Sequence, residues 1–170
     1  MSIASVLVDI RNFVTPPKSL IIQATFPLAA ASAYHATDVL SYSTASVSPW
    51  VFDFGFTGEI DFAMAVSVTT AITPRLVLHL FYDTPTCQMN DHATSTSPIA
   101  ADLLRIAGPI HFPGMTSVGA GMSYAIATPG TYGNLPVKYT KKKLYGVLHT
   151  LDAFTQTAGG NMTIFLGARS

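Results

Sequence analysis

The stretch 58–83 constrains the fold more than any other part of the chain. Its first half places an apolar side chain on every second residue, in the series Ile60, Phe62, Met64, Val66 and Val68. After a turn at Pro74, a second alternating series follows: Leu76, Leu78, Leu80 and Tyr82. Because side chains alternate between the two faces of a strand, each half predicts an amphipathic β-strand, and the pair predicts an antiparallel hairpin. An isolated hairpin is only marginally stable, so a second sheet has to cover its apolar face.

Most of the remaining chain also has the pattern of short strands, at 19–26, 50–56, 105–112, 122–127, 144–151 and 161–168. Ser97 and Pro98 predict the start of one short helix over 99–104. Roughly eight strands with long loops and little helix predict an all-β fold, an antiparallel jelly roll or β-sandwich with an extended N-terminal arm. We divide the chain into 1–33, an arm or strand extension, and 34–170, a jelly-roll domain that folds as a single unit.

The chain carries few charges for its length. Charged residues make up 11% of it, against roughly 25% in ordinary soluble domains. The nine basic and nine acidic residues cancel, and the mean hydropathy is +0.39. Net charge near zero promotes association, so we interpret the surface as one that copies of the chain or a partner largely cover. A compact monomer coated in Ser and Thr is the alternative.

Cysteine usage and the N-terminus bear on the compartment. Cys87 is the only cysteine, so an intrachain disulfide is excluded and no secretory compartment is implied. Asp9 falls where a signal peptide would be apolar, and no basic region precedes it. The uncharged stretches 19–37 and 106–137 are interrupted by proline, so we expect no membrane partner.

No pattern predicts a metal or cofactor site. A metal-binding jelly roll of the cupin type needs a closely spaced His-x-His, and no two of the five histidines, at 35, 79, 92, 111 and 149, lie within two residues of each other. Asp83, Cys87 and His92 surround one loop, but their spacing matches no known type of metal site. We therefore expect no metal and no cofactor.

Catalytic patterns are equally weak. Cys87 with His79 or His92 lacks a third group to orient the base, and the segment 121–125 lacks the second glycine and the α/β context of a nucleophile elbow. Glu59 and Asp61 share a strand face, whereas an acid–base pair usually comes from different elements across a cleft. We expect no enzymatic activity, and a small hydrolase using Glu59 and Asp61 is the least favoured hypothesis.

Four lysines form the one cluster of charge: Lys138, Lys141, Lys142 and Lys143. A neutral chain without an aromatic stacking surface is not typical of nucleic-acid binding, so we expect no nucleic-acid partner. Two interpretations stay open, a solvated turn before a strand and a docking patch for an acidic protein surface.

The order of landmarks over 34–168 resembles the jelly-roll cement (decoration) proteins on the capsids of tailed bacteriophages. The matching segments are YHATDVLS at 34–41, GEI at 58–60, LVLHLF at 76–81 followed by Pro85 and Asp91, GPI at 108–110, LYGVL at 144–148 and TIFL at 163–166. The resemblance implies a homotrimer on the outside of the capsid that bridges neighbouring major capsid proteins. It carries over no catalytic residue.

These observations predict a capsid cement protein on the outer surface of a virion, with the major capsid protein and its own copies as partners. Such a protein acts by mass action, through many weak contacts repeated by symmetry. The expected capsid or subunit contacts are Arg11, Phe13, Lys138, Lys141, Lys142 and Lys143. The alternative is a carbohydrate-binding jelly-roll module of a virion, based on the aromatic run 50–56 and on the loop residues Asp91, His92 and Tyr132.

Overall fold

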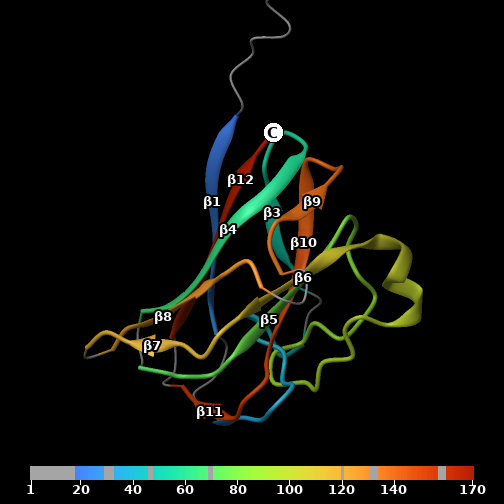
Figure 1. The fold of residues 1–170 in the computed structure, drawn as a ribbon. Helices are drawn as coiled ribbons and strands as arrows, with labels where there is room; N and C mark the ends of the chain where they lie inside the picture. The colour runs from blue at the N-terminus through green and yellow to red at the C-terminus, as the bar shows by residue number, and fades with distance from the viewer. Residues whose placement is uncertain are drawn as a thin grey trace, which may run out of the picture.

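The computed structural model describes residues 18–28, 33–45, 48–68, 71–119, 121–130, 134–156 and 160–170. Across these residues the chain forms two main antiparallel sheets packed face to face, a small two-stranded ladder and one 3₁₀ helix (Figure 1). The predicted all-β sandwich is therefore confirmed.

The larger sheet has six strands in the described part of the chain. Five of them follow in the order β1 (Ser19–Pro27), β12 (Asn161–Arg169), β4 (Gly58–Ser67), β8 (Ser123–Ala127) and β7 (Thr116–Ser117), and β9 (Val137–Tyr139) also pairs with β4. The smaller sheet has the order β3 (Trp50–Asp53), β10 (Lys143–Thr150), β5 (Leu76–Phe81) and β6 (Ile106–Phe112). The two-stranded ladder joins β2 (Ala33–Tyr34) to β11 (Phe154–Thr155), and the 3₁₀ helix η1 (Ala100–Arg105) lies between β5 and β6.

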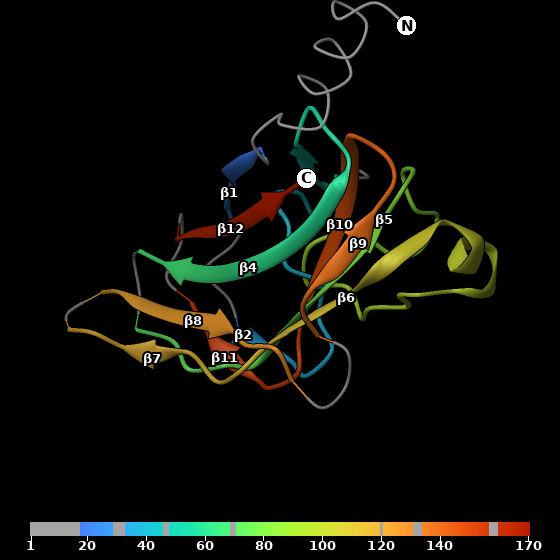
Figure 2. The ribbon, with the colours of Figure 1, turned by 45° about the horizontal axis from the view of Figure 1, so that its top comes forward.

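The connections cross repeatedly between the sheets. Along the chain, β3 of the smaller sheet is followed by β4 of the larger sheet (Figure 2). In the same way β5 is followed later by β8, and β10 by β12, and both β8 and β12 belong to the larger sheet. The resulting orders, β1-β12-β4-β8 and β3-β10-β5-β6, give the double-sheet jelly roll expected from the sequence. β1 comes from the segment 1–33 and pairs with β12 over its whole length.

The predicted hairpin within 58–83 is wrong. β4 lies in the larger sheet and β5 in the smaller one. The linker between them crosses the sandwich, where the buried Ile72 donates its amide to Ser123 Oγ at 3.0 Å and the Pro74 carbonyl accepts the Met115 amide at 3.2 Å. Alternation predicts that each strand has an apolar face. It does not distinguish two neighbouring strands of one sheet from two strands that lie in opposite sheets of a sandwich.

The core fills the space between the two sheets. Trp50 is 1% exposed, its ring stacks on Phe26 with centroids 4.2 Å apart, and its Nε1 donates to the Leu40 carbonyl at 3.0 Å. A Cβ on Gly146 of β10 would lie 3.2 Å from Trp50 Cβ and 2.8 Å from Leu78 Cδ1. Glycine at this position thus lets the tryptophan approach the backbone of the neighbouring strand.

A short helix is present as predicted near 99–104, as the 3₁₀ helix η1, whose Asp102 is fully buried. The predicted start at Ser97 and Pro98 is wrong, because Ile99 is the N-cap residue and no side chain caps the helix. Asp102 accepts hydrogen bonds from the amides of Thr86 (2.9 Å) and Cys87 (3.0 Å), which ties the loop after β5 to the helix. No helix within the described residues has the length and apolar character that crossing a membrane requires.

Candidate functional site

After Ile60, β4 buries the face opposite to the one that its alternation predicts. Ile60 is fully buried, but the next buried residues are Ala63, Ala65 and Ser67. The pairing with β12 explains this change, because Ile60 faces Ala168 while Phe62 faces Gly167, which leaves Asp61 as an extra residue on β4. A β-bulge of this kind changes which residues point to the core.

The bulge turns Phe62, Met64 and Val66 to the outside of the larger sheet, so their predicted place in the core is wrong. Neighbouring strands add apolar side chains to the same rows, since Met64 faces Phe165 on β12 and Ile126 on β8. We name this surface the outer apolar face and define it as Ile21, Phe62, Met64, Val66, Tyr124, Ile126 and Phe165. Ile21 is 65% exposed and Ile126 40% exposed, and the other members are partly buried.

The outer apolar face is separate from the core. None of its members belongs to a buried core cluster or packs against one. A Cβ on Gly167 would lie 3.0 Å from Phe62 Cβ, which shows that the Phe62 side chain lies beside Gly167 on this outer side. The polar residues in the same rows are uncharged, and the hydroxyls of Thr25 and Thr163 are hydrogen-bonded at 2.8 Å. Contiguous apolar surface of this kind marks a site of protein association.

Charged side chains gather at one end of this face. Arg169 Nη2 lies 2.6 Å from Glu59 Oε1, and Arg169 Nε lies 3.4 Å from Asp61 Oδ2. Both carboxylates are thus close to one guanidinium, and Glu59 also faces Lys138 in the ladder between β4 and β9. This arrangement balances charge at the surface, where Glu59, Lys138 and Arg169 also line a pocket of about 290 Å³.

The lysine cluster is interleaved with acids. Lys141 Nζ lies 2.8 Å from Asp83 Oδ1, and Lys143 Nζ lies 3.6 Å from Asp53 Oδ2. Lys142 is exposed between them in the turn from β9 to β10. Because acids accompany most of these lysines, the cluster does not present a field of a single sign. The other two expected contact residues, Arg11 and Phe13, lie outside the described residues.

The structure does not bring Asp83, Cys87 and His92 together as metal ligands. Asp83 pairs with Lys141, and the His92 ring stacks on Tyr34 with centroids 3.8 Å apart. Cys87 is buried in a small apolar cluster, where burial raises the pKa of its thiol and makes it a poorer nucleophile. Within the described ranges, no group of three or more His, Cys, Asp or Glu side chains is placed to hold a metal ion.

The residues that favoured carbohydrate binding are mostly buried. Trp50, Phe52 and Phe54 belong to the core and offer no stacking surface to a sugar. Asp91 is buried as well, and it accepts the Tyr34 hydroxyl at 3.0 Å and the Ser41 amide at 2.8 Å. Tyr132 lies outside the described residues. The aromatic run therefore no longer supports this alternative.

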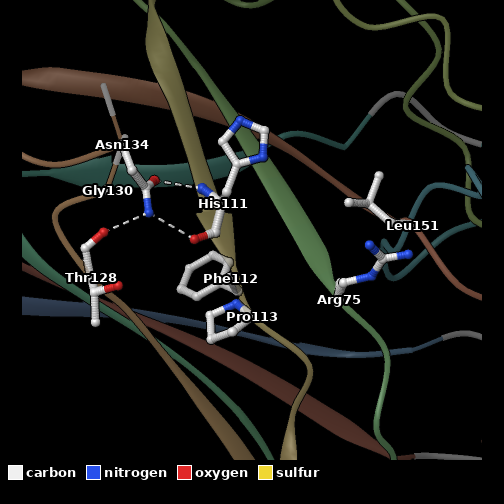
Figure 3. A pocket seen from close by; sticks show the side chains of 8 residues that line it. All are labelled: Arg75, His111, Phe112, Pro113, Thr128, Gly130, Asn134 and Leu151. Carbon is white, nitrogen blue, oxygen red and sulfur yellow. Dashed lines mark hydrogen bonds between the residues drawn. The ribbon is translucent and has the colours of Figure 1, made fainter. Parts of the chain in front are cut away.

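A pocket of about 330 Å³ opens at the end of the smaller sheet, lined by Arg75, His111, Phe112, Pro113, Thr128, Gly130, Asn134 and Leu151 (Figure 3). The Asn134 amide accepts from the His111 amide at 2.6 Å and donates to the carbonyls of His111 and Thr128. Arg75 makes a bidentate contact with Asp152, and hydrogen bonds from its side chain and backbone lower the pKa of that carboxyl to about 2. These polar groups are engaged in holding loops together, and the described residues that line the pocket include no carboxylate to act with His111.

Two histidines share the outer side of the smaller sheet. The rings of His79 and His149 stack with centroids 5.2 Å apart, and the Nδ1 atoms of both are buried without a hydrogen-bond partner among the described residues. Burial, followed by the neighbouring His149 and His111, lowers the pKa of His79 to about 4. Burial and His111 also lower the pKa of His149. Both rings are therefore neutral in the folded protein near neutral pH.

Comparisons of this chain with protein-family models, curated proteins and solved structures find no match.

Proposed function

We propose that the protein is a capsid cement (decoration) protein that binds the outer surface of a tailed-phage capsid as a homotrimer and stabilises contacts between major capsid proteins. The observation that carries the proposal is the outer apolar face. It spans neighbouring strands of the larger sheet, lacks charged members and contributes nothing to the core. A surface of this composition is matched to a protein partner rather than to a small polar ligand.

The rest of the molecule fits a structural role. The polar groups of the described pocket hold loops, and the acids nearest to the outer apolar face are paired with Arg169. A subunit that binds only the assembled shell stabilises it by mass action, and repeated copies multiply weak contacts into high avidity.

An exposed apolar helix also supports contacts between subunits. The helix η1, olive in Figure 1, projects beside the smaller sheet with Leu104 98% exposed and Leu103 55% exposed. It precedes the first residue of β6, whereas the pocket at Phe112 lies at the other end of that strand. A projection and a recess at opposite ends of one strand are suited to the head-to-tail contacts that close a ring such as a trimer.

The first test is co-sedimentation with capsids stripped of decoration. Met64→Glu and Phe165→Glu place a charge on the outer apolar face, and we expect them to abolish capsid binding while the far-UV spectrum stays that of the parent. Val51→Glu is the matched control, because Val51 is 43% exposed but belongs to the other sheet. Equal binding by all three variants would mean that another surface contacts the capsid.

The second test concerns the homotrimer. We expect sedimentation equilibrium to give an assembly of three subunits or a multiple of three for the parent protein and a smaller species for Leu104→Asp. A parent protein that is monomeric at micromolar concentration and missing from virions by mass spectrometry would contradict the proposal.

A second candidate function is a coat subunit that builds a shell by itself. The observation in its favour is the strand order of the two sheets, since double-sheet jelly rolls are the architecture of viral capsid domains. Electron microscopy of the purified protein separates the two functions, because a coat subunit forms closed particles alone and a cement protein requires the capsid.

A further inference from the structure

β1 is the outermost strand of the larger sheet (Figure 2). Its nine residues pair with β12 without a register shift, from Ser19 opposite Arg169 to Pro27 opposite Asn161. Among the described residues, no strand pairs with the other side of β1.

The hydrogen bonds at both ends of β1 show which residues face this open side. The Lys18 carbonyl accepts the Ser170 amide at 3.0 Å, and the Leu28 amide donates to the Gly160 carbonyl at 2.9 Å. In an antiparallel ladder such bonded positions recur at every second residue, so the even-numbered residues of β1 bond to β12. The backbone N–H and C=O groups that point away from the sheet are therefore those of Ser19, Ile21, Gln23 and Thr25.

β1 lacks the features that protect edge strands. Natural edges are usually short, charged, bulged or interrupted by proline. Among the described strands, β7 has two residues, β3 has four and ends in Asp53, and β6 contains Pro109 and a register shift against β5. β1 is long, regular and uncharged, with proline only at its last position and Ile21 65% exposed.

We propose that β1 pairs antiparallel with β1 of a second copy across a two-fold axis at Gln23, which joins the larger sheets of two subunits into one continuous sheet. In this register Ile21 lies opposite Thr25 of the partner subunit, and Gln23 lies opposite the partner's Gln23. The outward N–H and C=O groups of Ile21, Gln23 and Thr25 then pair with those of the partner strand, as in β-strand addition, whereas Ser19 lies opposite the partner's Pro27, which has no N–H to donate. The two-fold contact is distinct from the head-to-tail contact of the proposed homotrimer and does not rest on it.

A second copy of the chain is the partner that fits the open edge of β1 best. On the core side, the register places Leu20 opposite the partner's Phe26 and Ile22 opposite the partner's Ala24, so each large side chain meets an apolar one. No charged residue lies on β1, and the chain has zero net charge, so charge repulsion between the two β1 strands does not oppose their pairing. The pairing extends the outer apolar face across both subunits.

Cysteine cross-linking tests the two-fold axis directly. Opposed residues of a hydrogen-bonded antiparallel pair have Cα atoms about 5.5 Å apart, which lies within the range that a disulfide spans. We expect Gln23→Cys to form a disulfide-linked dimer under mild oxidation. Ser19→Cys is the matched control on the same side of the strand, where the two copies of residue 19 would lie about 27 Å apart.

The Gln23→Cys variant should yield about tenfold more cross-linked dimer than the control, as expected for thiols within disulfide range. The parent protein serves as a blank, since its one cysteine, Cys87, is buried. Equal yields from the two variants, or no dimer from Gln23→Cys, would overturn the proposal.

Two further variants separate pairing from folding. Gln23→Pro removes an outward N–H and no bond to β12, so the fold should persist while the β1 contact is lost. Gln23→Lys places two ammonium groups opposite each other and should weaken the contact in the same way, which keeps the test valid if the proline variant fails to fold. An unchanged self-association of Gln23→Lys, measured by sedimentation velocity across a concentration series, would count against the pairing.

Removal of residues 1–17 distinguishes a second copy from the chain's own beginning as the occupant. We expect the cross-linking yield of Gln23→Cys to stay the same after the deletion. A disulfide that forms only in the shortened chain would show that the first residues occupy this edge, and the proposal would fail.

Discussion

Gly146 is the position where a single methyl group should matter most for the core. A Cβ there would lie 2.8 Å from Leu78 Cδ1 and 3.2 Å from Trp50 Cβ. Crowding in a close-packed core destabilises by about 1–3 kcal/mol, so we expect Gly146→Ala to lower the free energy of unfolding by this amount in urea titrations. Gly130→Ala is the control, because its nearest neighbour would be 3.7 Å away. Equal stability of both variants would contradict the packing described here.

The stacked histidines should make stability depend on pH. Burial lowers the pKa of His79 to about 4, whereas the unfolded chain has the ordinary histidine value near 6.5. Below about pH 6.5 the unfolded state therefore binds more protons, and the stabilisation present above that pH is lost progressively as the pH falls towards 4. We expect His79→Gln to flatten this loss in urea titrations at a series of pH values. A slope for His79→Gln equal to that of the parent would contradict this assignment.

At the scale of the element, β4 shows how a bulge reverses a sequence pattern. The period of two is present from Ile60 to Val66, yet the extra residue at Asp61 changes the buried set to Ala63, Ala65 and Ser67. Sequence predicted the strand but not its orientation, because the register shift depends on pairing with Gly167 and Ala168 near the other end of the chain. The outer apolar face was missed for the same reason.

Opposite substitutions on neighbouring β4 residues test this orientation. Ala63 is fully buried, so Ala63→Leu should overpack the core and destabilise by about 1–3 kcal/mol. Met64 lies on the outer apolar face, and we expect Met64→Ala to change the free energy of unfolding by less than about 1 kcal/mol. The reverse order of the two effects would mean that β4 buries the face indicated by its sequence.

For the whole molecule, the dependence of assembly on salt follows from where its charges lie. The outer apolar face and β1 carry no charged residue, whereas the ion pairs Lys141–Asp83 and Arg169–Glu59 are exposed within one subunit. Screening by sodium chloride should therefore leave self-association and capsid binding intact, and sodium sulfate should strengthen both. Dissociation at high sodium chloride in sedimentation velocity would instead assign assembly to charged surfaces such as the lysine cluster.

The sequence alone determined the class of the fold, because the information for a strand is local. Alternation over 19–26 and 161–168, the aromatic run from Trp50 and the scarcity of helix were sufficient to predict an all-β sandwich. Only the tertiary structure decided which strands pair and which face of β4 is buried. Those choices depend on hydrogen bonds between distant segments, such as β1 with β12 and β4 with β12, and on a linker that carries the chain from one sheet to the other.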